Sequence, residues 1–232
     1  MKVYTGTSGF AYKEWKGSFY PEKLRNEEML SFYGGRFPTV EINNTFYRMP
    51  SSEVLARWRD DVPEDFRFVL KASRRITHQK RLKDSADSLR YLIEMSAALG
   101  DKLGPFLFQL PPNMKADLDR LTDFLGLLPR DCRAAFEFRH PSWFEDPVFE
   151  ALRARGAALC VADTGGDTDP PFVSTTDWGY LRLRRVEYTD AQLDEWVDGI
   201  RAQPWREAFA FFKHEDEATG PALAARFEER FA

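Results

Sequence analysis

The sequence predicts an α/β fold, a single TIM-type (β/α)8 barrel that forms one domain over residues 1–232. Short apolar or β-branched runs recur along the chain, and the segments between them have helical periodicity. No low-complexity linker or sharp change of composition divides the chain. Strands that alternate with helices pair in parallel through right-handed crossovers. Eight such units fit a closed barrel better than an open sheet.

The predicted strands are short runs spaced about 20 to 40 residues apart. They are Val3–Thr7, Thr39–Asn43, Phe68–Ala72, Pro105–Leu110, Ala134–Phe138, Ala158–Ala162, Tyr180–Leu183 and Phe209–Phe212. Helical periodicity is clearest over residues 85–99, 116–128 and 190–200, where apolar side chains recur on one face. Ser85 and either Thr189 or Asp190 are suitable N-caps for the first and last of these helices.

An open doubly wound sheet is the alternative fold. Such a sheet usually has a glycine-rich phosphate turn after its first strand. Here Gly6-Thr7-Ser8-Gly9 follows the first strand, but aromatic residues come next and the GxGxxG spacing is not met.

Composition excludes several classes of protein. A chain that is 43% hydrophobic and 15% aromatic has enough apolar surface for a large core, and two cysteines are too few for a disulfide scaffold. No apolar run approaches the roughly 18 residues that span a bilayer. The N-terminus has no signal-peptide pattern, so we expect a cytoplasmic protein without membrane contact. The net charge of −4 means that anion binding must be local.

Strand parity predicts which side chains point into the barrel. Val40 and Ile42 should face the outer helices, which turns Glu41 and Asn43 inward. The same reasoning places further polar side chains inside, near the C-terminal ends of their strands. They are Thr5, Thr7, Lys71, Gln109, Glu137, Arg139, Asp163, Arg182 and Arg184, with Lys213 directly after the last strand. A ring of polar groups at one end predicts a binding face at the C-terminal mouth.

The charges of this ring favour an anionic ligand. Its bases outnumber its acids, and the segment from Lys71 to Lys83 contains no acidic residue. The histidines His78, His140 and His214 fall on the same face. Tyr47 and Trp143 supply loop aromatics that can stack on sugars or bases, or pack together as a lid. The alternative for single pairs, such as Glu137 with Arg139, is a buried ion pair between neighbouring strands.

We expect an enzyme with hydrolase-like acid/base chemistry on a phosphate- or carboxylate-bearing ligand. Glu41 and Glu137 would be the acid and base, with different pKa values, and Asp163 would orient them. Lys71, Arg139, Arg182 and Lys213 would hold the anion. The other predicted substrate-binding residues are Asn43, Tyr47, Gln109, His140, Trp143, Arg184 and His214.

Three alternatives for the chemistry remain open. A divalent metal would have carboxylates and the imidazoles of His140 and His214 as ligands, but no HxH or HExxH spacing is present and we expect no cofactor. A Schiff base on Lys71 or Lys213 is the second. The third is binding without catalysis, of a phosphorylated metabolite or a nucleic-acid strand.

Several motifs carry a resemblance to a known family. They are Gly6-Thr7-Ser8-Gly9-Phe10 with Tyr12, Trp15, Gly17 and Phe19-Tyr20-Pro21, then Val40-Glu41-Ile42-Asn43-Asn44-Thr45-Phe46-Tyr47, Ile76-Thr77-His78, Phe108-Gln109-Leu110-Pro111-Pro112, and Glu137-Phe138-Arg139-His140 followed by Ser142-Trp143. In this order they resemble the YecE-like proteins, a family of unknown function, over most of the chain. The resemblance implies a TIM-type barrel and supplies no reaction. The chain departs from the family pattern at Arg184-Arg185 and Lys213-His214, which makes its mouth more basic.

Overall fold

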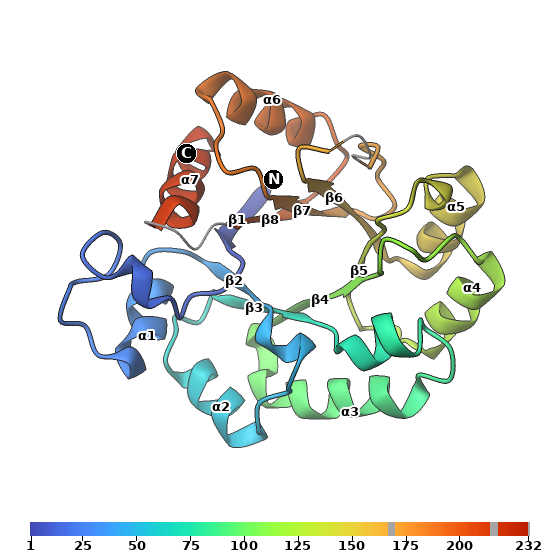
Figure 1. Ribbon diagram of the computed structural model, residues 1–232, viewed down its shortest axis with the longest axis horizontal. Helices are drawn as coiled ribbons and strands as arrows, with labels where there is room; N and C mark the ends of the chain where they lie inside the picture. Colours follow the sequence, from blue (N-terminus) through green and yellow to red (C-terminus); the bar gives the residue numbers. More distant parts are fainter. Residues whose placement is uncertain (167–169, 214–217, 232) are drawn as a thin grey trace.

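The computed structural model describes residues 1–166, 170–213 and 218–231. Within this part of the chain, parallel strands β1 to β8 close into a barrel in sequence order, as predicted (Figure 1). The strands are β1 Lys2–Thr7, β2 Thr39–Ile42, β3 Arg67–Lys71, β4 Leu103–Gln109, β5 Ala134–Glu137, β6 Ala158–Asp163, β7 Trp178–Leu183 and β8 Glu207–Phe212. The barrel closes because β8 pairs with β1 along its whole length.

Helices surround the barrel, and each follows a strand (Figure 1). They are α1 Met29–Gly34, α2 Ser52–Asp60, α3 Ala86–Ser96, α4 Leu118–Leu127, α5 Asp146–Arg155, α6 Asp190–Arg201 and α7 Thr219–Glu228. Among the described residues, β6 and β7 are joined without a helix. There the ring of Trp205 covers β7, and Gly179 is needed because a Cβ at that position would lie 2.3 Å from the indole.

Predicted helix signals act as expected at the start of α6. The side chain of Thr189 accepts a hydrogen bond from the backbone N–H of Gln192, whose side chain accepts one from the Thr189 backbone N–H. This reciprocal pair satisfies two N–H groups that have no partner within the helix. It fixes where the chain leaves the β7 loop and turns back along the barrel.

Two layers of apolar side chains hold the barrel. The inner layer fills the barrel itself, with Tyr4 stacked on Phe209 at 4.7 Å between ring centroids. The outer layer lies between strands and helices and includes Val40, Ile42 and Leu181. Strand parity therefore predicted the correct face for β2, β5 and β7, and the polar ends of these strands lie inside.

The predicted parity is wrong for β1 and for the end of β6. Tyr4 lies in the inner layer, so Thr5 and Thr7 face the helices, and Thr7 Oγ1 donates to the Tyr33 hydroxyl at 2.9 Å. Cys160 and Ala162 also lie in the inner layer, so Asp163 faces outward. Both strands carry apolar residues on each face, which removes the contrast on which a parity assignment depends.

Candidate functional site

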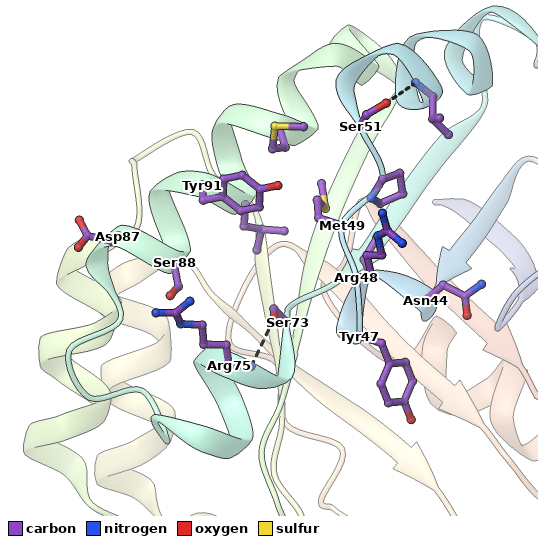
Figure 2. A pocket seen from close by; sticks show the side chains of 15 residues that line it. Asn44, Tyr47, Arg48, Met49, Ser51, Ser73, Arg75, Asp87, Ser88 and Tyr91 are labelled. Atoms are coloured by element: carbon purple, nitrogen blue, oxygen red, sulfur yellow. Dashed lines mark hydrogen bonds between the residues drawn. The ribbon is translucent and has the colours of Figure 1, made fainter.

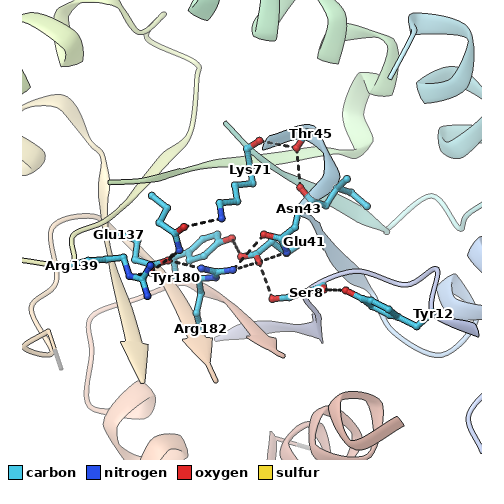
Figure 3. A network of polar contacts seen from close by, with 12 residues as sticks. Ser8, Tyr12, Glu41, Asn43, Thr45, Lys71, Glu137, Arg139, Tyr180 and Arg182 are labelled. Atoms are coloured by element: carbon cyan, nitrogen blue, oxygen red, sulfur yellow. Dashed lines mark hydrogen bonds and ion pairs between the residues drawn. The ribbon is translucent and has the colours of Figure 1, made fainter. Parts of the chain in front are cut away.

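A buried ion triad closes the C-terminal end of the barrel interior (Figure 3). Arg182 of β7 donates from one terminal nitrogen to Glu41 Oε1 of β2 at 2.8 Å, and from the other to Glu137 Oε2 of β5 at 2.6 Å. All three side chains are almost completely buried. One guanidinium thus joins strands from opposite sides of the barrel, and its charge is compensated by two carboxylates.

Both carboxylates are held in the charged form. Burial opposes ionisation of Glu41, but the charge of Arg182 and hydrogen bonds from Tyr180, Arg182 and Asn43 outweigh it and lower its pKa to about 2. Burial likewise opposes ionisation of Glu137, and Arg182 with Gln109 lowers its pKa overall. We expected the two pKa values to move apart, as in an acid and base pair. They move in the same direction because one arginine serves both groups.

Two residues of this network were not among the predicted site residues. The Tyr180 hydroxyl donates to Glu41 Oε2 at 2.6 Å, and the Ser8 hydroxyl donates to Glu41 Oε1 at 2.8 Å. Asn43 Nδ2, which was predicted, adds a third donor at 3.0 Å. The alternation of side chains along β7 predicted that Tyr180 points into the barrel. On β1, the same alternation starting from the inward-facing Tyr4 would have placed Ser8 inside as well. Glu41 is therefore held by side chains of β7, by the end of β1 and by the end of its own strand, β2.

Lys71 lies at the end of β3, beside the triad. Its Nζ donates to Gln109 Oε1 at 2.8 Å and lies 4.4 Å from the centre of the Phe46 ring. Gln109 Nε2 in turn lies 2.9 Å from each Glu137 oxygen, which fixes the direction of the amide. Burial and the charge of Arg182 lower the pKa of Lys71 to about 8, against the raising effect of both glutamates.

Further basic side chains surround this amine. Arg139 Nε lies 3.6 Å from Glu137 Oε1, and its side chain is about one-third exposed. Burial and the charge of Arg182 lower the pKa of the half-buried Arg184. Burial and the charges of Lys71 and Arg139 lower the pKa of His78. The mouth therefore collects basic side chains, and among them the charges of Lys71, Arg139 and Arg184 repel one another.

Asp163 belongs to a different cluster, so the prediction that it orients the glutamates is wrong. Its oxygens accept hydrogen bonds from Arg185 Nε at 2.7 Å and from the Tyr188 hydroxyl at 3.0 Å. The carboxylate also accepts from the Gly165 backbone N–H at 3.1 Å. These partners lie in the loops after β6 and β7, and they account for the burial of Asp163 outside the barrel interior.

Trp143 does not face the mouth either. Its ring stacks on Phe138 at 4.5 Å, and its Nε1 donates to the Met114 carbonyl at 2.7 Å. The side chain is fully buried in the outer layer, so the predicted role in stacking on a ligand is wrong. Loop aromatics bury their large apolar area when a neighbouring surface is available, and Phe138 provides one.

The other predicted binding residues lie at the rim. Tyr47 is 71% exposed. His140 Nδ1 accepts a hydrogen bond from the Ser142 backbone N–H and caps a short turn. Lys213 is half-buried directly after β8, and His214 lies outside the described residues. No set of three or more His, Cys, Asp or Glu side chains in the described part of the chain is arranged to hold a metal ion.

A groove of about 1090 Å³ opens beside the mouth (Figure 2). Its walls come from the loops after β2 and β3 and from α3, with Tyr47, Arg48 and Met49 on one side and Tyr91 on the other. No residue of the Glu41–Arg182–Glu137 triad lines it. Tyr47 therefore borders a groove that is separate from the buried triad.

Comparison of the sequence with known protein families identifies a match over almost the whole chain. The family model described as "Protein of unknown function DUF72" matches residues 4–232. The chain belongs to the DUF72 family. The expected YecE-like resemblance is thereby confirmed, and the family description names no reaction.

Individual DUF72 relatives are similar over different lengths. The chain is 25% identical to the YunF protein of Bacillus subtilis over 93% of this chain and 79% of that protein. It is 32% identical to the YecE protein of Escherichia coli over 58% of this chain, and it spans about half (52%) of YecE.

Solved structures from the DUF72 family share the barrel. A DUF72 protein from Thermotoga maritima superposes with a TM-score of 0.86 at 26% identity, over 100% of this chain and 99% of that one. One from Enterococcus faecalis gives 0.81 at 19% identity, over 98% and 94% respectively, and shows the fold alone. In the described residues of our structure, no helix is both long enough and apolar enough to span a bilayer.

Proposed function

We propose that the C-terminal mouth binds a small anionic ligand, one that bears a phosphate or a carboxylate, and carries out acid/base chemistry on it. The observation that supports this is the crowding of basic side chains at the mouth. Lys71, His78 and Arg184 each have a pKa lowered by burial and by neighbouring positive charges. Such an arrangement destabilises the folded protein, and a bound anion would offset this by attracting the positive charges.

The buried triad would support the site and would not itself bind the anion. Arg182 already pairs with both Glu41 and Glu137 through two short hydrogen bonds. In this proposal the ligand meets Lys71, Arg139 and Arg184, which are less buried than Arg182. Arginine and lysine suit phosphate and carboxylate oxygens because their N–H groups donate charge-assisted hydrogen bonds.

In this proposal Lys71, and not Glu41 or Glu137, is the group that gives and takes the proton. A carboxylate whose pKa is about 2 is a weak base near neutral pH. An amine whose pKa is about 8 exchanges its proton in the range where enzymes work. Hydrolase-like chemistry therefore needs Lys71 as the acid/base group, with Gln109 holding it in place.

Binding without catalysis is the second candidate function. It is favoured by the saturation of both buried carboxylates, since Glu41 and Glu137 already have several hydrogen-bond partners. The groove beside the mouth would then accommodate the remainder of a phosphorylated metabolite or a nucleic-acid strand, against Tyr47 and Tyr91. Conversion of a bound ligand to a product would favour catalysis, and binding without conversion would favour the second function.

Anion binding can be tested by titration calorimetry and thermal unfolding at constant ionic strength. We expect inorganic phosphate to raise the unfolding temperature, with a smaller effect after Arg184→Ala or Arg139→Ala. Arg206→Ala is the matched control, because Arg206 is exposed at the opposite end of the barrel, before β8. Equal stabilisation of all four proteins, or no response to phosphate or sulfate in any of them, would refute the proposal.

A further inference from the structure

We propose that Lys71 acts as a nucleophile that forms an imine with a small aldehyde or ketone carrying a phosphate or carboxylate group. This inference rests on the proposed function, because the cations of the mouth would select the anionic end of the same molecule. It adds a carbonyl group to the ligand class, and in the covalent step the Lys71 amine acts as the nucleophile in place of the acid/base group.

The contacts of Lys71 are compatible with a nucleophilic amine. Its Nζ has a neutral hydrogen-bond acceptor, Gln109 Oε1, and an aromatic ring, Phe46, as neighbours. Within the described residues it forms no direct ion pair with a carboxylate, although Glu41 and Glu137 lie near enough to act on its charge. A directly paired carboxylate would hold the ammonium proton and block attack.

Gln109 is oriented for the neutral amine as well as for the ammonium. Because its Nε2 lies 2.9 Å from each Glu137 oxygen, its Oε1 is turned toward Lys71. A neutral amine can keep this bond by donating one N–H to Oε1. Its lone pair then points away from Gln109, and the amine remains available to a carbonyl carbon.

The surrounding charges favour loss of the Lys71 proton. Arg182 and Arg184 repel the ammonium, and with burial they outweigh the attraction of Glu41 and Glu137, so that the pKa is about 8. An ordinary lysine has a pKa of 10.5. At about pH 8, the neutral fraction of Lys71 is therefore larger by a factor of roughly one hundred.

The step balances without an added oxidant or reductant. Lys71 first releases one proton, and its lone pair forms a C–N bond while the carbonyl π pair moves to oxygen. A second N–H proton then moves to that oxygen, which gives a carbinolamine. The C–O bond breaks next, the oxygen leaves as water with the proton first released, and the nitrogen lone pair forms the C=N bond. The positive charge of the ammonium is thus replaced by that of the iminium at the same position.

Reductive trapping tests this inference on the full chain. We would incubate the protein near pH 8 with pyruvate or dihydroxyacetone phosphate, add borohydride, and locate the adduct by peptide mass spectrometry. The expected result is an adduct at Lys71 that forms at least about tenfold faster than at any other lysine. The pair of probes distinguishes a carboxylate from a phosphate ligand.

Two variants and one probe supply the controls. Lys71→Arg keeps a cation but cannot form an imine, so it should lose the adduct. Lys23→Arg changes an exposed lysine in the β1–α1 loop and should label like the wild-type protein. Uncharged dihydroxyacetone should label Lys71 at least about tenfold more slowly than its phosphate, since it lacks the anion.

The outcomes separate this inference from the proposed function. Phosphate binding without a Lys71 adduct would overturn the imine and leave anion binding in place. Labelling of Lys71 at the rate of Lys23 would also overturn it, because no selective nucleophile would exist. Equal labelling by charged and uncharged probes would refute the anionic substrate class. The absence of both phosphate binding and an adduct would refute both proposals.

Discussion

Arg182→Met tests the central contact of the barrel mouth. The substitution keeps a side chain of similar length but removes the guanidinium that donates to Glu41 and Glu137. The two carboxylates would then lie inside the barrel without their shared cation. Removing one partner of a buried ion pair is more damaging than replacing the whole group, because the remaining charge stays buried.

The expected loss can be estimated from Glu41 alone. Its pKa is lowered from 4.5 to about 2, and one pKa unit corresponds to about 1.4 kcal/mol, so its ionisation stabilises the fold by about 3 kcal/mol. Broken buried pairs cost about 3–5 kcal/mol in other proteins. A domain is stable by about 5–15 kcal/mol, so the variant should fold with a markedly lower free energy of unfolding.

The loss should depend on pH, with a sign that follows from the charges. In the wild-type protein the lowered pKa of Glu41 contributes stability that is present above about pH 4.5 and is lost as the pH falls toward 2. In Arg182→Met, burial acts unopposed by the guanidinium and raises the pKa of Glu41 and Glu137. The variant is then destabilised further as the pH rises above about 4.5.

Urea unfolding followed by tryptophan fluorescence, at about pH 5 and about pH 7.5, measures both effects. The difference between wild type and variant should be larger at the higher pH. The matched control is Glu41→Gln combined with Glu137→Gln and Arg182→Met, which removes all three charges and should recover much of the loss. A loss below about 1 kcal/mol at neutral pH, or one that does not shrink at about pH 5, would refute this account of the triad.

Three further predictions concern Lys71, Tyr180 and the two cysteines. Lys71→Met should stabilise the fold by about 1–3 kcal/mol at neutral pH. This gain should fade as the pH rises from about 8 toward 10.5, because the wild-type ammonium then loses its proton. Thermal unfolding at several pH values measures the gain, and a gain that does not change with pH would contradict the prediction. Tyr180→Phe removes a hydrogen-bond donor 2.6 Å from Glu41 and should lower the free energy of unfolding by about 1–3 kcal/mol. Urea unfolding measures this loss, and an unchanged midpoint would contradict the prediction. Burial raises the pKa of Cys132 to about 11 and also raises the pKa of Cys160, so native thiols should react with a disulfide reagent far more slowly than unfolded ones. Rapid labelling of the native protein would contradict this.

Much of the candidate site was predictable where a strand has contrast between its faces. On β2 and β7, apolar residues alternate with charged or polar ones, and Glu41 and Arg182 were placed inside correctly. On β6, both faces are apolar up to Asp163, and the prediction failed there. The position of Trp143 in a loop could not be predicted from periodicity, because its direction depends on contacts with Phe138 and Met114.

The order of the strands, the closure of the barrel and the gathering of polar side chains at one mouth were determined by the sequence itself, because hydrophobic periodicity is a local property of the chain. Only the tertiary structure decided that one arginine serves two glutamates, since Arg182 and Glu41 are 141 residues apart in sequence and 2.8 Å apart in space. Charge interactions depend on distance and burial, which are fixed when the strands close. For this reason the charged state of Glu41 and Glu137, and the weakly held proton of Lys71, were decided by the folded barrel.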